Sequence, residues 1–300
     1  MKRSERRNSA ESIRARLLDL ARARREDFQL TLSQYAIERF LYRLGQSGFQ
    51  DQFVLKGAML FVLWEGHLHR PTRDLDFLGY GSPDLETIAG IFRQVSAIEA
   101  DDGIAFDMTD LRVERIKEDA DYEGVRLSFL ARLAGARIPM QIDVGFGDAA
   151  SPVPATFPVL LPLDPPQIQA YQRETVIAEK LQAMVVLDIR NSRMKDFFDL
   201  WAMCRTWPFD LEPLRKAIVS TFERRSTPLP TKTPFALTDG FLLDAQKTAQ
   251  WRGFLRRLRL QDETPDLHIV GGELREFLKP VLLADAPQAL TWPAGGPWRT

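Results

Sequence analysis

The stretch Val54–Leu78, VLKGAMLFVLWEGHLHRPTRDLDFL, predicts a short apolar strand, a turn at Gly57, an apolar helix, a loop and a second strand. The second strand carries Asp74 and Asp76. Because side chains two positions apart on a strand point to the same face, these two carboxylates lie together, opposite the apolar residues of the strand. Two close carboxylates repel each other unless a cation lies between them, and hard divalent ions such as Mg²⁺ prefer oxygen ligands. The stretch therefore predicts a site for a metal-bound triphosphate.

An Asp-x-Asp pair is a weak signal by itself, since such pairs are common on protein surfaces. Here the pair is flanked by apolar residues, follows Arg73, and lies a short distance after a strand–glycine–helix unit. A glycine before the start of a helix leaves backbone N–H groups and the positive end of the helix directed at phosphate. The combination favours a functional pair over a chance one.

Asp143 is a lone acid between apolar residues near the end of a later predicted strand. An exposed acid on the solvated face of a strand is the ordinary explanation, and in isolation it would be preferred. Beside Asp74 and Asp76, however, Asp143 completes a site for two metal ions about 3.5–4 Å apart, which can activate an attacking hydroxyl and stabilise a leaving pyrophosphate. In this prediction the first two aspartates share both ions, and Asp143 holds the ion at the attacking oxygen.

Two later helical segments carry further polar candidates. Lys180 borders an apolar stripe, and its spacing alone leaves open a solvent-directed lysine or a phosphate contact. In RMKDFFDLW, Arg193, Asp196 and Asp199 recur at intervals of three, which is typical of a solvated salt-bridge ladder. The aromatic residues on the other side would bury this helix, so its polar row is predicted to face a cleft or a domain junction.

Together these segments resemble the AbiEii/AbiGii toxin family of nucleotidyltransferases, which includes the MenT toxins, over most of residues 50–205. The family's first block is Gly-Gly/Ser, a helix and an R-x-[ST]-x-D-[IL]-D segment, and it appears here as Lys56-Gly57-Ala58 and RPTRDLDF at residues 70–77. The later blocks resemble QIDVGFGD, ETVIAEKLQAM and RMKDFFDLW. Ala58 departs from the family, which often has a second Gly or a Ser there, and this removes a possible hydroxyl contact to phosphate.

The resemblance implies an α+β (mixed) fold, with a nucleotidyltransferase-like mixed sheet flanked by helices and a helical C-terminal domain. It also implies that Asp74 and Asp76 bind magnesium, that Lys180 contacts the nucleotide and that Asp196 is needed for catalysis. The predicted catalytic residues are then Asp74, Asp76, Asp143, Lys180 and Asp196, the predicted metal ligands are Asp74, Asp76 and Asp143, and the predicted nucleotide-binding residues are Lys56, Gly57, Ala58, Thr72, Arg73, Lys180 and Lys195.

The expected organisation has N-terminal helices over residues 1–50, a nucleotidyltransferase core over 51–166 and a helical C-terminal domain over 167–290 that completes the active site. Six prolines between residues 152 and 166 mark the boundary. The patterns predict helices over 9–25, over 31–45 with Thr31 as N-cap, and up to residue 97 with Ser82 as N-cap. They predict four strands between 103 and 146 and one over 157–161. Further helices are expected over 173–187, 193–204, 212–224, 238–260 and 266–283, followed by a frayed tail.

The composition gives more information on the expected cellular location than on the binding partner. The 300 residues hold 40 basic and 41 acidic side chains, so a nucleic-acid surface would have to be a local patch. The basic N-terminus and the segment 247–259, which interleaves arginines with Trp251 and Phe254, are the candidates for an RNA-backbone contact. One cysteine, Cys204, suits a reducing cytoplasm, and neither a signal peptide nor a membrane span is predicted. The pair His67 and His69 lacks further ligands for zinc.

The function implied by the resemblance is that of a toxin in a toxin–antitoxin (abortive-infection) system. We expect a magnesium-dependent, cytoplasmic nucleotidyltransferase that moves a nucleoside monophosphate from a nucleoside triphosphate to RNA, with the tRNA 3′ end as the favoured acceptor. Its partner would be a cognate antitoxin, an AbiEi-like winged-helix protein. Two alternatives remain: transfer to a small molecule or a protein hydroxyl, such as Thr72, and a non-catalytic nucleotide-binding module.

Overall fold

The chain folds into two compact units. In this computed structural model, the described residues are 9–68, 70–72, 74–119, 122–148, 150–282 and 290–300. The first unit comprises residues 1–147 and 152–171, and the second comprises residues 148–151 and 172–300. The predicted nucleotide contact Arg73, the ring of His69 and the basic residues before Ser9 lie outside the described residues.

The first unit is built on a seven-stranded sheet in the order β3-β4-β5-β2-β1-β7-β6. β2 runs parallel to β5 and β1 runs parallel to β7, while the remaining neighbours are antiparallel. This mixed sheet confirms the predicted fold class. Its strands are β1 (Phe53–Lys56), β2 (Asp74–Gly79), β3 (Ala105–Asp119), β4 (Tyr122–Leu133), β5 (Ala136–Phe146), β6 (Val153–Thr156) and β7 (Gln167–Ala170).

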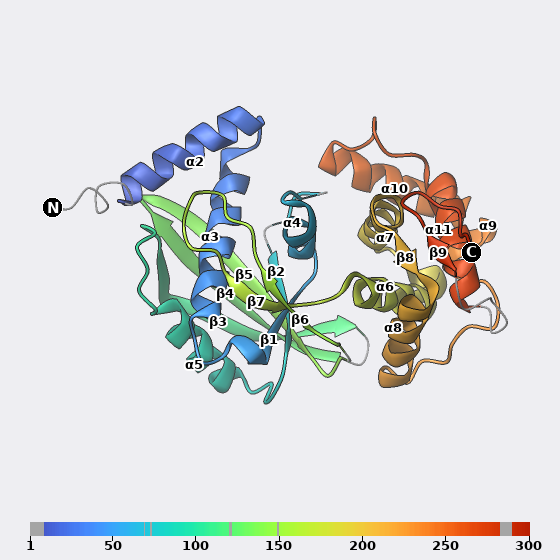
Figure 1. The fold of residues 1–300 in the computed structure, drawn as a ribbon, viewed down its shortest axis with the longest axis horizontal. Coiled ribbons are helices and arrows are strands. Elements are labelled where there is room, and N and C mark those ends of the chain that lie inside the picture. The colour runs from blue at the N-terminus through green and yellow to red at the C-terminus, as the bar shows by residue number, and fades with distance from the viewer. Residues whose placement is uncertain (1–8, 69, 73, 120–121, 149, 283–289) are drawn as a thin grey trace. The chain divides into compact units, whose positions relative to one another are not determined.

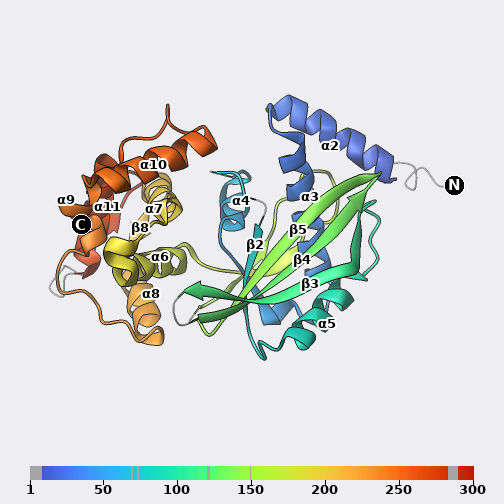
Figure 2. The ribbon, with the colours of Figure 1, turned by 180° about the vertical axis from the view of Figure 1, so that it is seen from behind.

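Helices cover one face of this sheet. The first unit holds α2 (Ala10–Arg24), α3 (Phe28–Gly45), α4 (Met59–Glu65) and α5 (Leu85–Ser96), with a 3-10 turn η1 (Gln50–Gln52). Figure 1 shows α3 and α5 lying across the sheet, and Figure 2 shows the same strands from the opposite side. Phe40 of α3 stacks on Phe92 of α5 at 5.6 Å, and Phe92 meets Phe53 of β1 at 5.2 Å. The aromatic core therefore takes up the apolar face and leaves the other face to polar side chains.

A buried charge network fixes α3 to the loop after α5. The carboxylate of Asp102 accepts hydrogen bonds from Arg39 Nε at 3.0 Å and from Arg43 Nη1 at 2.6 Å and Nη2 at 3.1 Å. The exposed fractions of the three side chains are only 1–3%. Arg43 also donates to the carbonyl of Ile98 at 2.9 Å. One acid is thus shared by two arginines inside the helix–sheet layer, and Arg39 also lies 3.4 Å from the carboxylate of Glu38.

Two predicted helix starts in this unit are wrong, and in both a nearby aspartate is the cap. α3 begins at Phe28, where Asp27 accepts from the backbone N–H of Leu30, whereas the predicted cap Thr31 is buried within the helix. α5 begins at Leu85, because Asp84 accepts from the N–H of Thr87. The predicted cap Ser82 instead accepts from the N–H of Asp84. An aspartate satisfies free N–H groups as well as a hydroxyl does and adds a charge that favours the helix start.

The strands also differ from the prediction in two places. Two of the predicted strands between 103 and 119 form the single strand β3, whose pairing with β4 shifts between Asp107 and Arg112. The segment 157–161 is not a strand; the strands β6 and β7 lie on either side of it, and Phe157 N–H donates to the carbonyl of Pro166. Prolines lack the N–H that a ladder needs, so pairing stops where they cluster.

The second unit is mainly helical. It contains α6 (Arg173–Leu187), η2 (Asp188–Arg190), α7 (Met194–Thr206), α8 (Leu211–Arg224), η3 (Phe235–Leu237), α9 (Asp239–Leu242), α10 (Ala245–Leu258) and α11 (Leu267–Leu282), with short strands β8 (Phe209–Asp210) and β9 (Thr291–Trp292). α6 matches its predicted bounds. The helix predicted over 238–260 is broken, because Asp244 caps a new helix at Lys247 N–H. No helix among the described residues is long and apolar enough to cross a membrane.

The C-terminal tail is ordered where it was expected to fray. β9 pairs with β8, and Trp292 is only 4% exposed. Its indole N–H donates to the carbonyl of Cys204 at 2.7 Å, and its ring meets Phe277 at 5.0 Å. Tryptophan buries a large apolar area once its N–H has a partner, and Trp298, whose indole N–H donates to the carbonyl of Phe277 at 2.9 Å, adds a second such anchor.

We expect Asp102→Ala to destabilise the first unit by about 3–5 kcal/mol, because it leaves Arg39 and Arg43 buried without their carboxylate. Urea denaturation followed by circular dichroism measures this. Glu99→Ala, at an exposed position three residues earlier, is the control and should cost less than about 0.5 kcal/mol. Equal effects of the two substitutions would contradict the role of the network.

Candidate active site

The turn between β1 and α4 is shaped around a carboxylate. Gly57 has φ +75, and a Cβ atom there would overlap the carboxylate oxygen of Asp76 and lie 2.7 Å from its Cγ. Only glycine can therefore combine this backbone conformation with so close an approach. Ala58 follows with ordinary helical φ and ψ as the N-cap of α4. The turn of the strand–glycine–helix unit is thus moulded to Asp76.

Four charged residues form a row across four neighbouring strands. The strand registers pair Lys56 of β1 with Asp76 of β2, Asp76 with Asp143 of β5, and Asp143 with Arg126 of β4. Residues in direct register on adjacent strands share a face, so the order of charges is plus, minus, minus, plus. The sheet thus brings together the acids of β2 and β5 that were predicted to converge.

The guanidinium of Arg126 binds both carboxylate oxygens of Asp143. Its Nε lies 2.8 Å from Oδ1 and its Nη2 lies 2.7 Å from Oδ2, a bidentate geometry. These hydrogen bonds raise the pKa of Arg126; burial opposes them, and the negative charges of Asp143 and Asp74 add to the rise. Arg126 therefore neutralises one of the two adjacent acids.

Asp74 begins β2 and is exposed, two residues from Asp76 on the same face. Its backbone N–H donates to the hydroxyl of Thr72 at 3.3 Å, which holds that hydroxyl beside the start of the strand. Lys56, at the other end of the charge row, is 5% exposed. These positions belong to one unit and to one face of its sheet.

The donor set of β2 fits a hard divalent cation. Asp74 and Asp76 supply carboxylate oxygens from one face, and the glycine turn packs against the second of them. Among the residues that the structure describes, no three His, Cys, Asp or Glu side chains are grouped closely enough to hold a metal ion. The oxygens of Asp143 are engaged by Arg126, so its role as a third ligand stays a prediction.

In the second unit, the predicted polar residues of α6 and α7 meet. Lys180 Nζ donates to Asp196 at 2.7 Å and to Asp199 at 2.9 Å, and both acids are 1% exposed. Arg193 Nε lies 2.8 Å from the second oxygen of Asp196, as an ion pair without hydrogen-bond alignment. Burial alone would raise the pKa of Asp196, but the charges of Lys180 and Arg193 outweigh it, so the pKa lies below its ordinary value.

The row on α7 is therefore a buried ion-pair cluster instead of a solvated ladder. Lys195, the other predicted nucleotide contact of this helix, is exposed and adds to the field at Asp196. Cys204 is buried, and burial raises the pKa of its thiol to about 12. Within this unit, Lys180 is the group that joins α6 to the acids of α7.

Sequence reasoning missed two arginines. Arg126 had a usable signal, because a tight turn at Ala134–Gly135 pairs residue 126 with residue 143. Arg225 had none: it binds Asp148 with two hydrogen bonds of 2.7 and 2.9 Å and donates to Gln182 at 2.9 Å, and these partners are far apart in the sequence.

The basic helix α10 is only partly available as an RNA surface. Lys247 is 4% exposed and donates to the carbonyl of Asn191 at 2.8 Å. Trp251 is fully buried, and its indole N–H donates to the carbonyl of Pro265. These two residues are therefore structural, while Arg252, Arg256, Arg257 and Arg259 are exposed.

Comparison with known proteins gives a family. Residues 39–273 match the family described as "Nucleotidyl transferase AbiEii toxin, Type IV TA system". No curated protein matches the chain. One similar crystal structure is described as "putative nucleotidyltransferase from H. pylori", with 18% identity, a TM-score of 0.46 and coverage of 81% of this chain and 91% of that one. A second, JHP933 from Helicobacter pylori, has 16% identity, a TM-score of 0.43 and coverage of 80% and 90%.

We expect Gly57→Ala to cost more stability than Gly135→Ala, although the two glycines have nearly equal φ values of +75 and +78. Both substitutions carry the strain of a left-handed residue, about 1–2 kcal/mol. Only Gly57 would also push a methyl group against Asp76, since a Cβ at Gly135 meets nothing within 4 Å. Denaturation of both variants measures the difference, and equal losses would argue against the close approach of Asp76.

Lys180→Ala should destabilise the second unit by about 3–5 kcal/mol, because it leaves Asp196 and Asp199 buried with too little positive charge. The lowered pKa of Asp196 means that its contribution is present above its unfolded-state pKa and is lost as the pH falls through the folded value. Without Lys180 that pKa rises, so acid unfolding should begin at a higher pH. Lys216→Ala, at an exposed position on α8, is the control; an acid-unfolding midpoint shared by the two variants would refute the prediction.

Proposed function

We propose a reaction for this chain from its family: it belongs to the AbiEii nucleotidyl transferase toxins of type IV toxin–antitoxin systems. It is therefore a nucleotidyltransferase with an antitoxin partner. We propose that it transfers a nucleoside monophosphate from a nucleoside triphosphate to a hydroxyl of RNA, with the tRNA 3′ end as the preferred acceptor. The observation that carries the proposal is the charge row Lys56–Asp76–Asp143–Arg126, with Asp74 at its side.

The reaction forms a bond between the acceptor oxygen and the α-phosphorus and breaks the bond to the pyrophosphate oxygen. The group that the donor set of β2 suits is Mg²⁺, which Asp74 and Asp76 would hold. When bound, it would neutralise phosphate charge and polarise the reacting phosphoryl group. The protein's own side chains and backbone would position the nucleoside triphosphate and the acceptor.

The residues of the first unit can position a triphosphate by charge and by shape. Because Gly57 has no side chain, the carboxylate of Asp76 can lie against its backbone, which fixes the position of that carboxylate at the start of α4. Lys56 supplies a positive charge from the neighbouring strand at that level of the sheet. Arg126 binds both oxygens of Asp143 and so orients a carboxylate that is to accept a hydrogen bond from the attacking hydroxyl.

We assign Lys180 a contact to the nucleotide and Asp196 a positioning role. What supports this is the fixed geometry inside the second unit, where two buried carboxylates hold one ammonium group. A lysine held in this way loses little side-chain entropy when it meets a phosphate. The assignment makes Asp196 necessary because it positions Lys180.

Support for RNA as the acceptor is the exposed arginine face of α10, which is Arg252, Arg256, Arg257 and Arg259. Phosphate contacts by arginine give affinity that falls with salt. The antitoxin partner would be an AbiEi-like winged-helix protein, as is usual in the resembled family.

The decisive experiment incubates purified protein with Mg²⁺, total RNA and each α-labelled nucleoside triphosphate. We expect label to appear in RNA of tRNA size, and Asp74→Ala to reduce its rate at least about 100-fold, as expected for loss of a group that stabilises the transition state. Asp19→Ala, at an exposed position on α2, is the matched acidic control and should label RNA at the wild-type rate. Wild-type protein that labels no RNA, or Asp74→Ala that labels it equally, would reject the proposal.

The same reactions test a second acceptor. The hydroxyl of Thr72 is held beside Asp74, which favours it among the protein's own hydroxyls. Intact-mass spectrometry after incubation with nucleotide would reveal a nucleotidyl or phosphoryl adduct there, and Thr72→Val should abolish it. An unchanged mass would leave RNA as the acceptor.

A further inference from the structure

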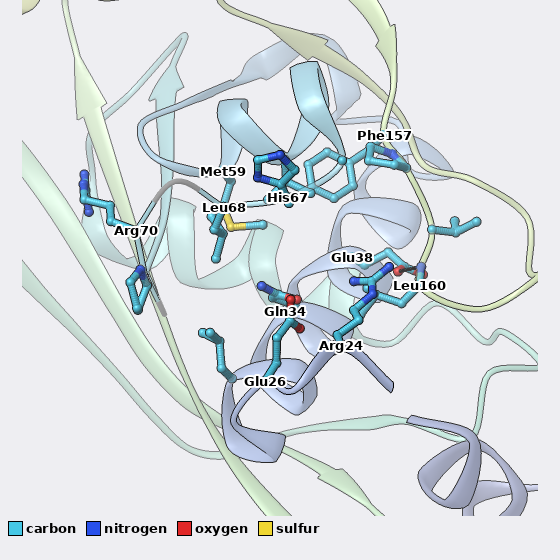
Figure 3. Close-up of a pocket in the computed structure, with 16 residues that line it drawn as sticks. Arg24, Glu26, Gln34, Glu38, Met59, His67, Leu68, Arg70, Phe157 and Leu160 are labelled. Atoms are coloured by element: carbon cyan, nitrogen blue, oxygen red, sulfur yellow. Dashed lines mark hydrogen bonds between the residues drawn. The ribbon is translucent and has the colours of Figure 1, made fainter. Parts of the chain in front are cut away.

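A pocket of about 220 Å³ opens in the first unit, and none of the charge-row residues lines it. Its walls come from the α2–α3 junction, from α4 with the segment after it, and from the loop 157–160. Figure 3 shows Met59, His67 and Leu68 on one side and Arg24, Glu26 and Gln34 on the opposite side. The site therefore has one largely apolar wall and one polar wall.

The polar wall contains an unsatisfied acceptor. Glu26 Oε2 is buried and has no hydrogen-bond partner among the described residues. A carboxylate with an unpartnered buried oxygen costs free energy, on the order of 1–3 kcal/mol or more, so a donor that reaches the Glu26 carboxylate from the pocket would be stabilising. Gln34 lies next to it in Figure 3 and offers both a donor and an acceptor.

A second acid lines the pocket from the side of α3. Glu38 is 1% exposed, and its Oε2 accepts from the backbone N–H of Leu160 at 2.7 Å. Burial raises the pKa of Glu38 to about 7, although this hydrogen bond and the charge of Arg39 oppose the rise. Both oxygens of Glu38 therefore have partners within the protein, since Oε1 accepts from Arg39, and Glu26 is the acid of the pocket wall that has an unpartnered oxygen.

The pocket lies within reach of the reacting groups. Met59, which lines it, is two residues after Gly57, and Pro71, which also lines it, is three residues before Asp74. Three residues span at most about 11 Å, so the wall at Pro71 is within that distance of the carboxylate strand. A group bound here is about one nucleoside away from a phosphate held at Asp74 and Asp76.

We propose that this pocket receives a single nucleobase and that Glu26 recognises an exocyclic amino group on the edge of that base. The inference rests on the proposed function and adds the recognition site. The volume is below the roughly 300–1,000 Å³ of sites that enclose a whole drug-sized ligand, so it suits one ring system. Apolar side chains such as Met59 and Leu68 can pack on the face of the ring, and a carboxylate accepts from an amino group.

This chemistry discriminates between bases. Adenine, cytosine and guanine carry an exocyclic amino group, whereas uracil offers carbonyl oxygens at those positions. A carboxylate is an acceptor only, so it would repel the carbonyls of uracil. The base can belong to the incoming nucleoside triphosphate or to the terminal nucleotide of the RNA acceptor, and the two sources share this recognition.

The test measures binding by isothermal titration calorimetry, with no transfer reaction required. One arm titrates the full chain with Mg²⁺ and each of the four nucleoside triphosphates, and the other uses short RNAs that differ only in their 3′-terminal base. The variants are Glu26→Ala, which removes the acceptor, and Leu30→Trp, which fills the pocket with a larger ring. Glu86→Ala, exposed on α5 and away from the pocket lining, is the matched control.

We expect both pocket variants to weaken binding about tenfold or more in one arm, and Glu26→Ala to remove the preference over uracil there. Loss in the triphosphate arm identifies the incoming base, and loss in the RNA arm identifies the acceptor base. The inference is overturned if neither variant changes the wild-type affinity. It is also overturned if the wild-type protein binds uracil as tightly as the other bases in both arms. The RNA-labelling assay tests transfer separately, so labelling that persists with unchanged binding refutes only the pocket, whereas pocket-dependent binding without labelling refutes only the transfer.

Discussion

The placement of Asp76 beside Asp143 on neighbouring parallel strands is the constraint on which the rest of the first unit depends. Adjacent strands are about 4.7–4.9 Å apart, and like charges directly opposite each other are destabilising. Positive charges offset this repulsion from both sides, because Lys56 lies opposite Asp76 and Arg126 lies opposite Asp143. The glycine turn then brings backbone against the inner carboxylate. The candidate site thus contains two acids whose mutual repulsion is offset by basic residues on the flanking strands.

Buried acids are paired with basic side chains elsewhere in the molecule as well. Asp102 forms ion pairs with two arginines of α3, and Asp148 forms one with Arg225. The two acids of α7 both pair with Lys180. Each cluster joins segments that are distant in sequence, and each would be costly to break at one partner because a buried charge would remain. Loss of activity on replacing such a residue therefore has two possible origins, structural and chemical, which stability measurements separate.

Several features followed from local pattern. The strand–turn–helix–strand unit around Gly57 was predictable because alternation on a strand and the need for positive φ are properties of adjacent residues. α6 was predicted with its correct bounds because its apolar spacing is regular. The errors fell at competing caps, such as Asp27 and Asp84, and at Asp244, where one aspartate divides a continuous helical pattern in two. No local pattern indicated that Trp292 of β9 would anchor the tail, since its partners Cys204 and Phe277 lie on α7 and α11.

The sequence by itself predicted the candidate site residues and determined which face of each strand they occupy, because both depend on residue type and on spacing along the chain. The tertiary structure alone decided the partners: that Arg126 takes both oxygens of Asp143, that Lys180 is shared by two buried acids, and that Glu26 contributes an unsatisfied oxygen to a pocket. Strand register and helix packing set these distances, and ionic and hydrogen-bond energies depend on distance and burial, which sequence separation does not encode.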